Sequence, residues 1–146
     1  MLLTKFDVNG VILWTKEYNF TNASLTGFEN VTGAIGLPNG DIAFCGNALG
    51  INTDVGQPLP ATFNIIGVIS NNGPLKWVKR FREYYTESGG AVTGITAMND
   101  ALFITSSYGI MKMSVADGTL MGLQKKFQNF CLFICFTNNI NTRDMF

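Results

Sequence analysis

The most constraining feature of this 146-residue sequence is a stretch that it contains twice. Residues 7–18 read DVNGVILWTKEY and residues 70–81 read SNNGPLKWVKRF, so that a glycine, a tryptophan and a lysine follow one another at the same spacing. An asparagine followed by a glycine tolerates the positive φ angles that tight hairpin turns require. The sequence therefore predicts the same β-hairpin in two places.

A second block of sequence also recurs. Residues 30–46 read NVTGAIGLPNGDIAFCG and residues 90–106 read GAVTGITAMNDALFITS, with the Val-Thr-Gly triplets in step. Both blocks repeat after about 60 residues, which indicates a repeat architecture. The predicted organisation is half a unit (2–18), a full unit (28–81), a shorter unit (91–127) and a divergent C-terminal tail (128–146).

A third and weaker copy of the first stretch lies in residues 108–127. Asp117-Gly118 occupies the turn position of the earlier copies, but Gly122 stands where a tryptophan is expected. The regular repeat therefore becomes degenerate in the last unit.

Each unit is predicted to contain four short strands. In the full unit, apolar and β-prone runs are joined by PNG and NNG turns, and residues 1–127 lack the 3.6-residue period of an amphipathic helix. The predicted fold class is all-β. The first architecture is consecutive four-stranded antiparallel blades of an incomplete β-propeller, and the alternative is a β-sandwich of hairpins.

The half-unit that runs from Ile65 through Gly73 and Trp77 to Phe81 resembles the outer hairpin of quinoprotein-like (PQQ-like) β-propeller repeats. The resemblance covers roughly residues 1–127 and implies that the tryptophan of the last strand packs between neighbouring blades. Propellers close with roughly 4 to 8 blades. About two and a half blades imply a piece of a longer propeller, a truncated gene model or a protomer that completes its ring by association.

Composition excludes several classes of function. The chain has no histidine, and its charged residues make up only 14% of the sequence, ten basic and ten acidic. Without histidine there is no Ser/His/Asp or Cys/His nucleophile arrangement, and the commonest metal ligand is missing. The balanced charge predicts no nucleic-acid partner. The longest apolar run, FCLFICF at 130–136, is too short for the ~20 residues of a membrane helix, so no membrane insertion is predicted.

The three cysteines, Cys45, Cys131 and Cys135, cannot all pair within one chain. They are predicted to be free, buried apolar residues, and a Cys131–Cys135 bridge remains an alternative. The quinoprotein resemblance carries no quinone cofactor to this chain, because neither cation-coordinating carboxylates nor adjacent cysteines are recognisable. No cofactor or metal site is predicted.

The loops between strands are the predicted binding surfaces, with Arg82, Tyr84 and Tyr85 as candidate partner-binding residues. The alternative is that the two tyrosines cover the junction between blades. Trp14 and Trp77 could stack on a ligand, but their fixed place in a repeated strand favours a packing role.

Other polar groups are assigned to local structure. Asp41, Asp100 and Asp117 are interpreted as turn residues, and the basic stretch at 76–82 as a solvated strand edge. Glycosylation sequons begin at Asn19, Asn22 and Asn30.

These observations favour a non-enzymatic β-propeller segment that acts as a protein-interaction or scaffold module. Its expected partner is another protein or additional blades. Two alternatives stay open: a fragment of a larger propeller enzyme, and an extracellular glycan-binding surface protein whose sequons are occupied. The compartment is not predicted.

Overall fold

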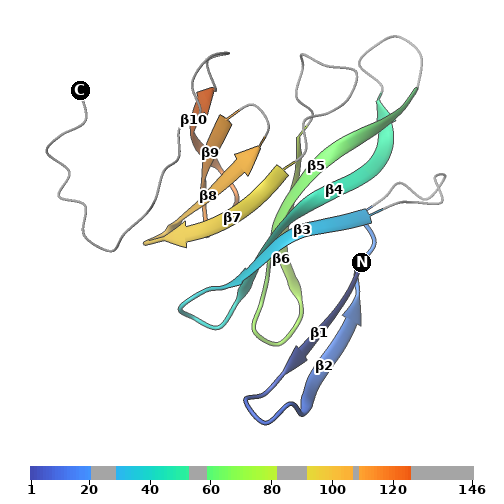
Figure 1. Cartoon of the computed structure of the whole chain (residues 1–146), viewed down its shortest axis with the longest axis vertical. Helices are drawn as coiled ribbons and strands as arrows, with labels where there is room; N and C mark the ends of the chain where they lie inside the picture. The colour runs from blue at the N-terminus through green and yellow to red at the C-terminus, as the bar shows by residue number, and fades with distance from the viewer. Residues whose placement is uncertain (21–28, 53–58, 82–91, 107–108, 126–146) are drawn as a thin grey trace, which may run out of the picture.

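The structure is a computed structural model of the whole chain, and it describes residues 1–20, 29–52, 59–81, 92–106 and 109–125 (Figure 1). This part of the chain contains ten β-strands and no helix, which confirms the all-β prediction. The strands are β1 (Leu2–Phe6), β2 (Ile12–Glu17), β3 (Glu29–Gly36), β4 (Ile42–Asn52), β5 (Leu59–Ile69), β6 (Leu75–Phe81), β7 (Val92–Met98), β8 (Ala101–Ser106), β9 (Gly109–Ser114) and β10 (Leu120–Lys125).

The strands form three antiparallel sheets in which each strand pairs with its neighbour in sequence. The first sheet is β1-β2, the second is β3-β4-β5-β6 and the third is β7-β8-β9-β10. The second sheet lies between the other two in Figure 1, where the first sheet is at the lower right and the third at the upper left. Propeller blades and a sandwich are both compatible with this arrangement.

The last hairpin of every sheet contains the same irregularity. One residue near the start of β2, β6 and β10 has no partner on the neighbouring strand, namely Leu13, Lys76 or Met121. The register beyond this bulge pairs Trp14 with Lys5, Trp77 with Val68 and Gly122 with Lys112. Gly122 therefore occupies the tryptophan position of the third sheet, as the sequence alignment predicts.

The repeated Val-Thr-Gly triplets also mark a bulge. Thr32 in β3 and Thr93 in β7 are skipped in the pairing with the next strand. The hydroxyl of Thr32 donates to the carbonyl of Cys45 at 3.4 Å, and that of Thr93 donates to the carbonyl of Thr105 at 3.3 Å. The triplet recurs because a β-branched residue with a hydroxyl bridges the same local break in both sheets.

The second sheet is buried on both of its faces. Alternate side chains along β4 and β5 enter two separate cores, as a strand period of two requires. The core shared with the first sheet contains Tyr18, Phe20, Phe44, Ala48, Ile65 and Ile69. The core shared with the third sheet contains Leu37, Ala43, Cys45, Ile66, Val68, Val92, Leu102, Ile104, Met111 and Met113. The described sheets are thus stacked in the order first, second, third.

Candidate functional site

The candidate binding residues Arg82, Tyr84 and Tyr85 lie outside the described residues. The same holds for Cys131 and Cys135. The described cysteine, Cys45, is buried and free, as the sequence predicts. The sites that the structure does describe are the two junctions between sheets and the two sheet faces that no other described strand covers.

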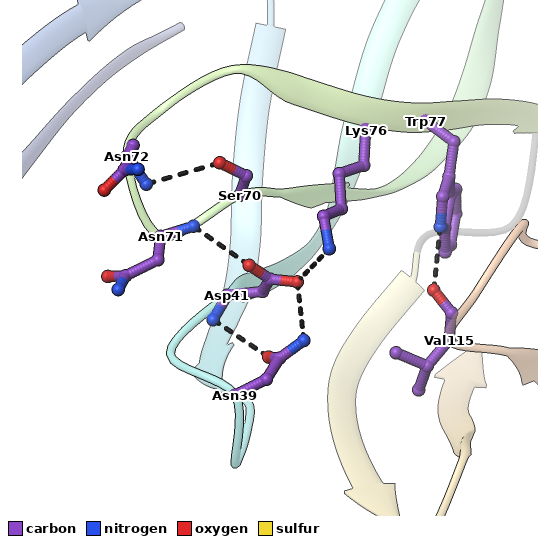
Figure 2. Close-up of polar contacts among 8 residues, drawn as sticks. All are labelled: Asn39, Asp41, Ser70, Asn71, Asn72, Lys76, Trp77 and Val115. Atoms are coloured by element: carbon purple, nitrogen blue, oxygen red, sulfur yellow. Dashed lines mark hydrogen bonds and ion pairs between the residues drawn. The ribbon is translucent and has the colours of Figure 1, made fainter.

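Both tryptophans belong to a junction between sheets. The indole nitrogen of Trp14 in the first sheet donates to the carbonyl of Asn71, in the β5–β6 turn of the second sheet, at 2.9 Å. The indole nitrogen of Trp77 in the second sheet donates to the carbonyl of Val115, in the β9–β10 turn of the third sheet, at 2.8 Å (Figure 2). Each ring also packs against one of the two cores. The predicted packing role of both tryptophans is confirmed.

A lysine and a glycine complete each junction. A Cβ placed on Gly73 would lie 2.7 Å from Cδ of Lys16, and one placed on Gly118 would lie 3.0 Å from Cγ of Lys79. Both glycines have positive φ, +96° and +71°, which other residues rarely adopt. The aliphatic part of each lysine therefore covers the glycine turn of the next sheet, and the ammonium nitrogen of Lys16 also lies 3.0 Å from the position of a Cβ on Gly73.

Tyr18 adds a polar contact to the first junction. Its hydroxyl donates to the carbonyl of Gly73 at 2.5 Å, and burial raises the pKa of this phenol above its ordinary value. Lys5 also reaches this turn, where its ammonium group donates to the side chain of Asn71. The first hairpin is therefore fastened to the second sheet by several side chains at once.

The carboxylate of Asp41 joins three groups of the second sheet (Figure 2). It is 5% exposed, and its carboxylate accepts from the amide nitrogen of the Asn39 side chain at 2.8 Å and from the Asn71 backbone at 2.9 Å. The ammonium group of Lys76 lies 2.5 Å from the same carboxylate. Burial alone would raise the pKa of Asp41, but the hydrogen bonds from Lys76, Asn71 and Asn39 and the charge of Lys76 outweigh it and hold this pKa below its usual value.

These contacts correct two interpretations made from the sequence. The interpretation of Asp41 as a turn residue equivalent to Asp100 is incomplete, because the strand register aligns Asp41 with Ala101 and its carboxylate joins two turns and a strand. The interpretation of Lys76 as a solvated edge residue is also incomplete, because it pairs with this buried carboxylate.

In the third sheet, a backbone carbonyl takes the place of the Asp41 carboxylate as the acceptor for the equivalent turn amide. The Val115 amide, which corresponds to the Asn71 amide, donates to the carbonyl of Asp100 at 3.0 Å. The position of Lys76 is taken by Met121. Two apolar residues, Ala101 and Met121, therefore replace the ion pair of Asp41 and Lys76 in the third sheet.

The first sheet has an uncovered apolar face. Leu3 and Trp14 point toward the second sheet, so the alternation of the strands places Leu2, Phe6 and Ile12 on the opposite side. These three side chains are 70%, 54% and 58% exposed. The corresponding residues of the second sheet include Ile65 and Ile69, which are fully buried, whereas Leu75 is 40% exposed at the strand edge. We call Leu2, Phe6 and Ile12 the open face of the first sheet.

The uncovered face of the third sheet is more polar. Thr105 stands where the second sheet has Cys45, and Lys112 stands where it has Val68. The ammonium group of Lys112 lies 5.8 Å from the ring centre of Phe103, over its face. The surface is hollowed here, in a depression lined by Met98, Asn99, Asp100, Ala101, Phe103, Lys112 and Met121. The two ends of the described stack therefore differ in character.

No group of three or more histidine, cysteine, aspartate or glutamate side chains in the described segments could hold a metal ion. None of these segments forms a helix long and apolar enough to cross a membrane. No protein-family model matches the sequence, and no curated protein matches it either.

Proposed function

We propose that this chain is a β-propeller-type segment that acts as a protein-interaction or scaffold module rather than as an enzyme. The observation that carries the proposal is the open face of the first sheet. The equivalent face of the second sheet, which carries Ile65 and Ile69, is buried against the first sheet. On the first sheet, Leu2, Phe6 and Ile12 are exposed to solvent. Apolar side chains gathered on one sheet face are typical of a surface that another protein covers.

The way the sheets are joined supports the propeller-type arrangement. The same tryptophan-to-carbonyl hydrogen bond occurs at both junctions, at equivalent positions of successive sheets. A two-layer sandwich buries one face of each sheet, whereas the second sheet is buried on both faces. Repetition of one junction is the behaviour of stacked repeat units, whose interfaces form only with their neighbours.

The roles of the repeated side chains support an interaction module over an enzyme. Trp14, Trp77 and Asp41 are the residues that most resemble a ligand or catalytic set in the described segments, and all three are engaged in contacts that join turns or sheets. Because these three residues are used in internal contacts, we assign the function to the exposed faces of the first and third sheets.

Hydroxyl-radical footprinting tests the proposal. The oxidation rate of Phe6 is measured in the purified chain and in native material from the source cells, and Met98, 52% exposed on the third sheet, is the control. We expect Phe6 to be protected in the native material relative to the purified chain, while Met98 changes less. Equal rates for Phe6 in the two samples would contradict a role for this face in an interaction.

A further inference from the structure

We infer that the open face of the first sheet is a docking site for a β-hairpin whose outer strand carries a Trp-x-Lys sequence, and that this hairpin lies outside the 146 residues of the chain. The inference rests on the proposed function and specifies the chemistry of the partner. It follows from comparing three equivalent turns, two of which are occupied in the structure.

The three turns share one pattern of backbone hydrogen bonds. In each, a residue at the end of the incoming strand donates its amide to a carbonyl just before the outgoing strand: Asp7 to Val11, Ser70 to Pro74 and Ser114 to Thr119, at 2.9, 2.8 and 2.9 Å. In each, a glycine with positive φ donates back across the turn: Gly10 to Asp7, Gly73 to Ser70 and Gly118 to Ser114. The turn of the third sheet is one residue longer, whereas the turn of the first sheet has the same spacing as the second-sheet turn that receives Trp14.

The receiving groups of the first turn are unoccupied. By register, the carbonyl that corresponds to Asn71 and Val115 is that of Val8, a fully exposed residue, and no hydrogen bond to it occurs among the described residues. A Cβ placed on Gly10 would meet no atom within 4 Å. The equivalent position at Gly118 is 2.7 Å from the ring of Trp77. Both the acceptor and the contact surface for a Trp-x-Lys strand are therefore present and open.

The face beside this turn has the matching apolar character. Phe6 and Ile12 correspond to Met113 and Leu120 of the third sheet, which lie beside the turn that receives Trp77. Thr4 and Thr15 lie between Leu2 and Phe6 on this face, and their hydroxyl oxygens are 3.2 Å apart, so each already has a hydrogen-bond partner. Glu17 lies opposite Leu2 on this face, at the end away from the turn, and its equivalent in the second sheet, Arg80, is exposed. A hairpin that covers the part of the face beside the turn therefore meets apolar side chains and the paired threonines.

A second copy of the chain is not the inferred occupant. The sequence contains two tryptophans, and both are used at the internal junctions. The third hairpin has Gly122 at the tryptophan position, and its uncovered face carries Lys112 and Thr105. A copy could offer a Trp-x-Lys strand only by undoing one of its own junctions, so the strand must come from elsewhere.

The experiment uses the full chain and a cyclic peptide as the probe. The peptide has the sequence of residues 64–81, the β5–β6 hairpin that docks on the third sheet through Trp77. Asn64 and Phe81 are paired in the hairpin, so joining the ends preserves its register, and closure is needed because isolated hairpins are only marginally stable. The first turn offers Val8 where the natural acceptor of this hairpin is Val115.

Binding is measured by titration calorimetry and by amide chemical shifts of the ¹⁵N-labelled chain. We expect saturable binding with shifts at Val8 to Gly10. A peptide with Trp77→Ala should bind at least about tenfold more weakly, because buried tryptophans are typical hot spots. Phe6→Ser in the chain should weaken binding to a similar degree, while Leu123→Ser, at an equally exposed leucine of the third sheet, should not.

Two results would overturn the inference. One is the absence of saturable binding, or binding that neither peptide Trp77→Ala nor chain Phe6→Ser weakens. The other is dimerisation of the chain alone that Phe6→Ser abolishes, seen by size-exclusion chromatography with light scattering, because the occupant would then be a second copy. If Phe6 is protected in native material but the peptide does not bind, the proposed function stands and the Trp-x-Lys chemistry is wrong.

Discussion

The indole nitrogen of Trp77 lies 2.8 Å from the carbonyl oxygen of Val115, and this hydrogen bond joins the last strand of the second sheet to the last turn of the third. Trp14 makes the same bond to Asn71 one sheet earlier. Both tryptophans, which could stack on a ligand, instead join one sheet to a turn of the next.

Trp77→Ala is expected to destabilise the chain by about 3 kcal/mol, because a large ring is removed from a packed junction. Trp77→Phe keeps most of the packing and loses the hydrogen bond to Val115, so about 1 kcal/mol is expected. Urea unfolding followed by circular dichroism measures both. An unchanged unfolding midpoint for Trp77→Ala would mean that the ring does not hold the sheets together.

Gly118→Ala is expected to destabilise more than Gly10→Ala. The two glycines have similar φ angles, +71° and +80°, so the backbone penalty is about 1 kcal/mol at both. At Gly118 the added methyl would also lie 2.7 Å from the ring of Trp77, which must move, and a total of about 2 to 3 kcal/mol is expected. Thermal denaturation of the two variants compares them directly, and equal losses would show that the junction is not tightly packed at this turn.

Asp41→Asn is expected to reduce stability at neutral pH by about 2 kcal/mol and to flatten the acid side of the stability profile. The pKa of Asp41 is lower in the folded protein than in the unfolded chain. Its contribution is therefore complete above the ordinary pKa of 3.8 and is lost as the pH falls through the lower folded value.

The matched control for this variant is Asp100→Asn, which changes an exposed carboxylate of the β7–β8 turn. Unfolding is measured at a series of pH values from neutral down to about 2, the range over which a paired carboxylate is titrated. If Asp41→Asn and the unmodified chain lose stability in parallel on acidification, the ion pair with Lys76 does not contribute as described.

Cys45 is expected to react slowly with iodoacetamide in the folded chain. Its side chain is fully buried, and burial raises the pKa of the thiol, while the Thr32 hydroxyl 3.6 Å away only partly opposes this effect. Peptide-level mass spectrometry should show alkylation at least about a hundredfold slower than in urea, because access requires opening of the sheet. Similar rates in both conditions would show that the core between the second and third sheets opens readily.

The local features of the fold are readable from the sequence because they depend on near neighbours. The Asn-Gly and Asp-Gly turns place positive φ angles at Gly10, Gly73 and Gly118, as the hairpin prediction requires. The aligned repeats also identify Gly122 as the replaced tryptophan. These patterns do not reveal the bulge at Thr32, because a skipped residue in one strand is defined only by the pairing with its partner strand.

The ion pair between Asp41 and Lys76 is a contact that the sequence does not predict. Asp41 looks like a turn residue because it follows Asn39-Gly40, and Lys76 looks like an edge lysine because it lies among other basic residues. They meet because the bulge in β6 turns Lys76 toward a turn that lies 35 positions earlier in sequence. No periodicity within either segment signals that pairing.

The sequence by itself determined the class of this protein: an all-β chain of repeated hairpins, with tryptophans at one fixed strand position. Turn residues and strand alternation act over a few residues, so they are visible in a single sequence. Only the tertiary structure decided that each Trp docks on the next turn, that the second sheet is covered on both faces, and that the open face with Phe6 is apolar while the one with Lys112 is more polar. Those outcomes depend on which face of one sheet meets which turn of another, and that is set by packing between segments far apart in the chain.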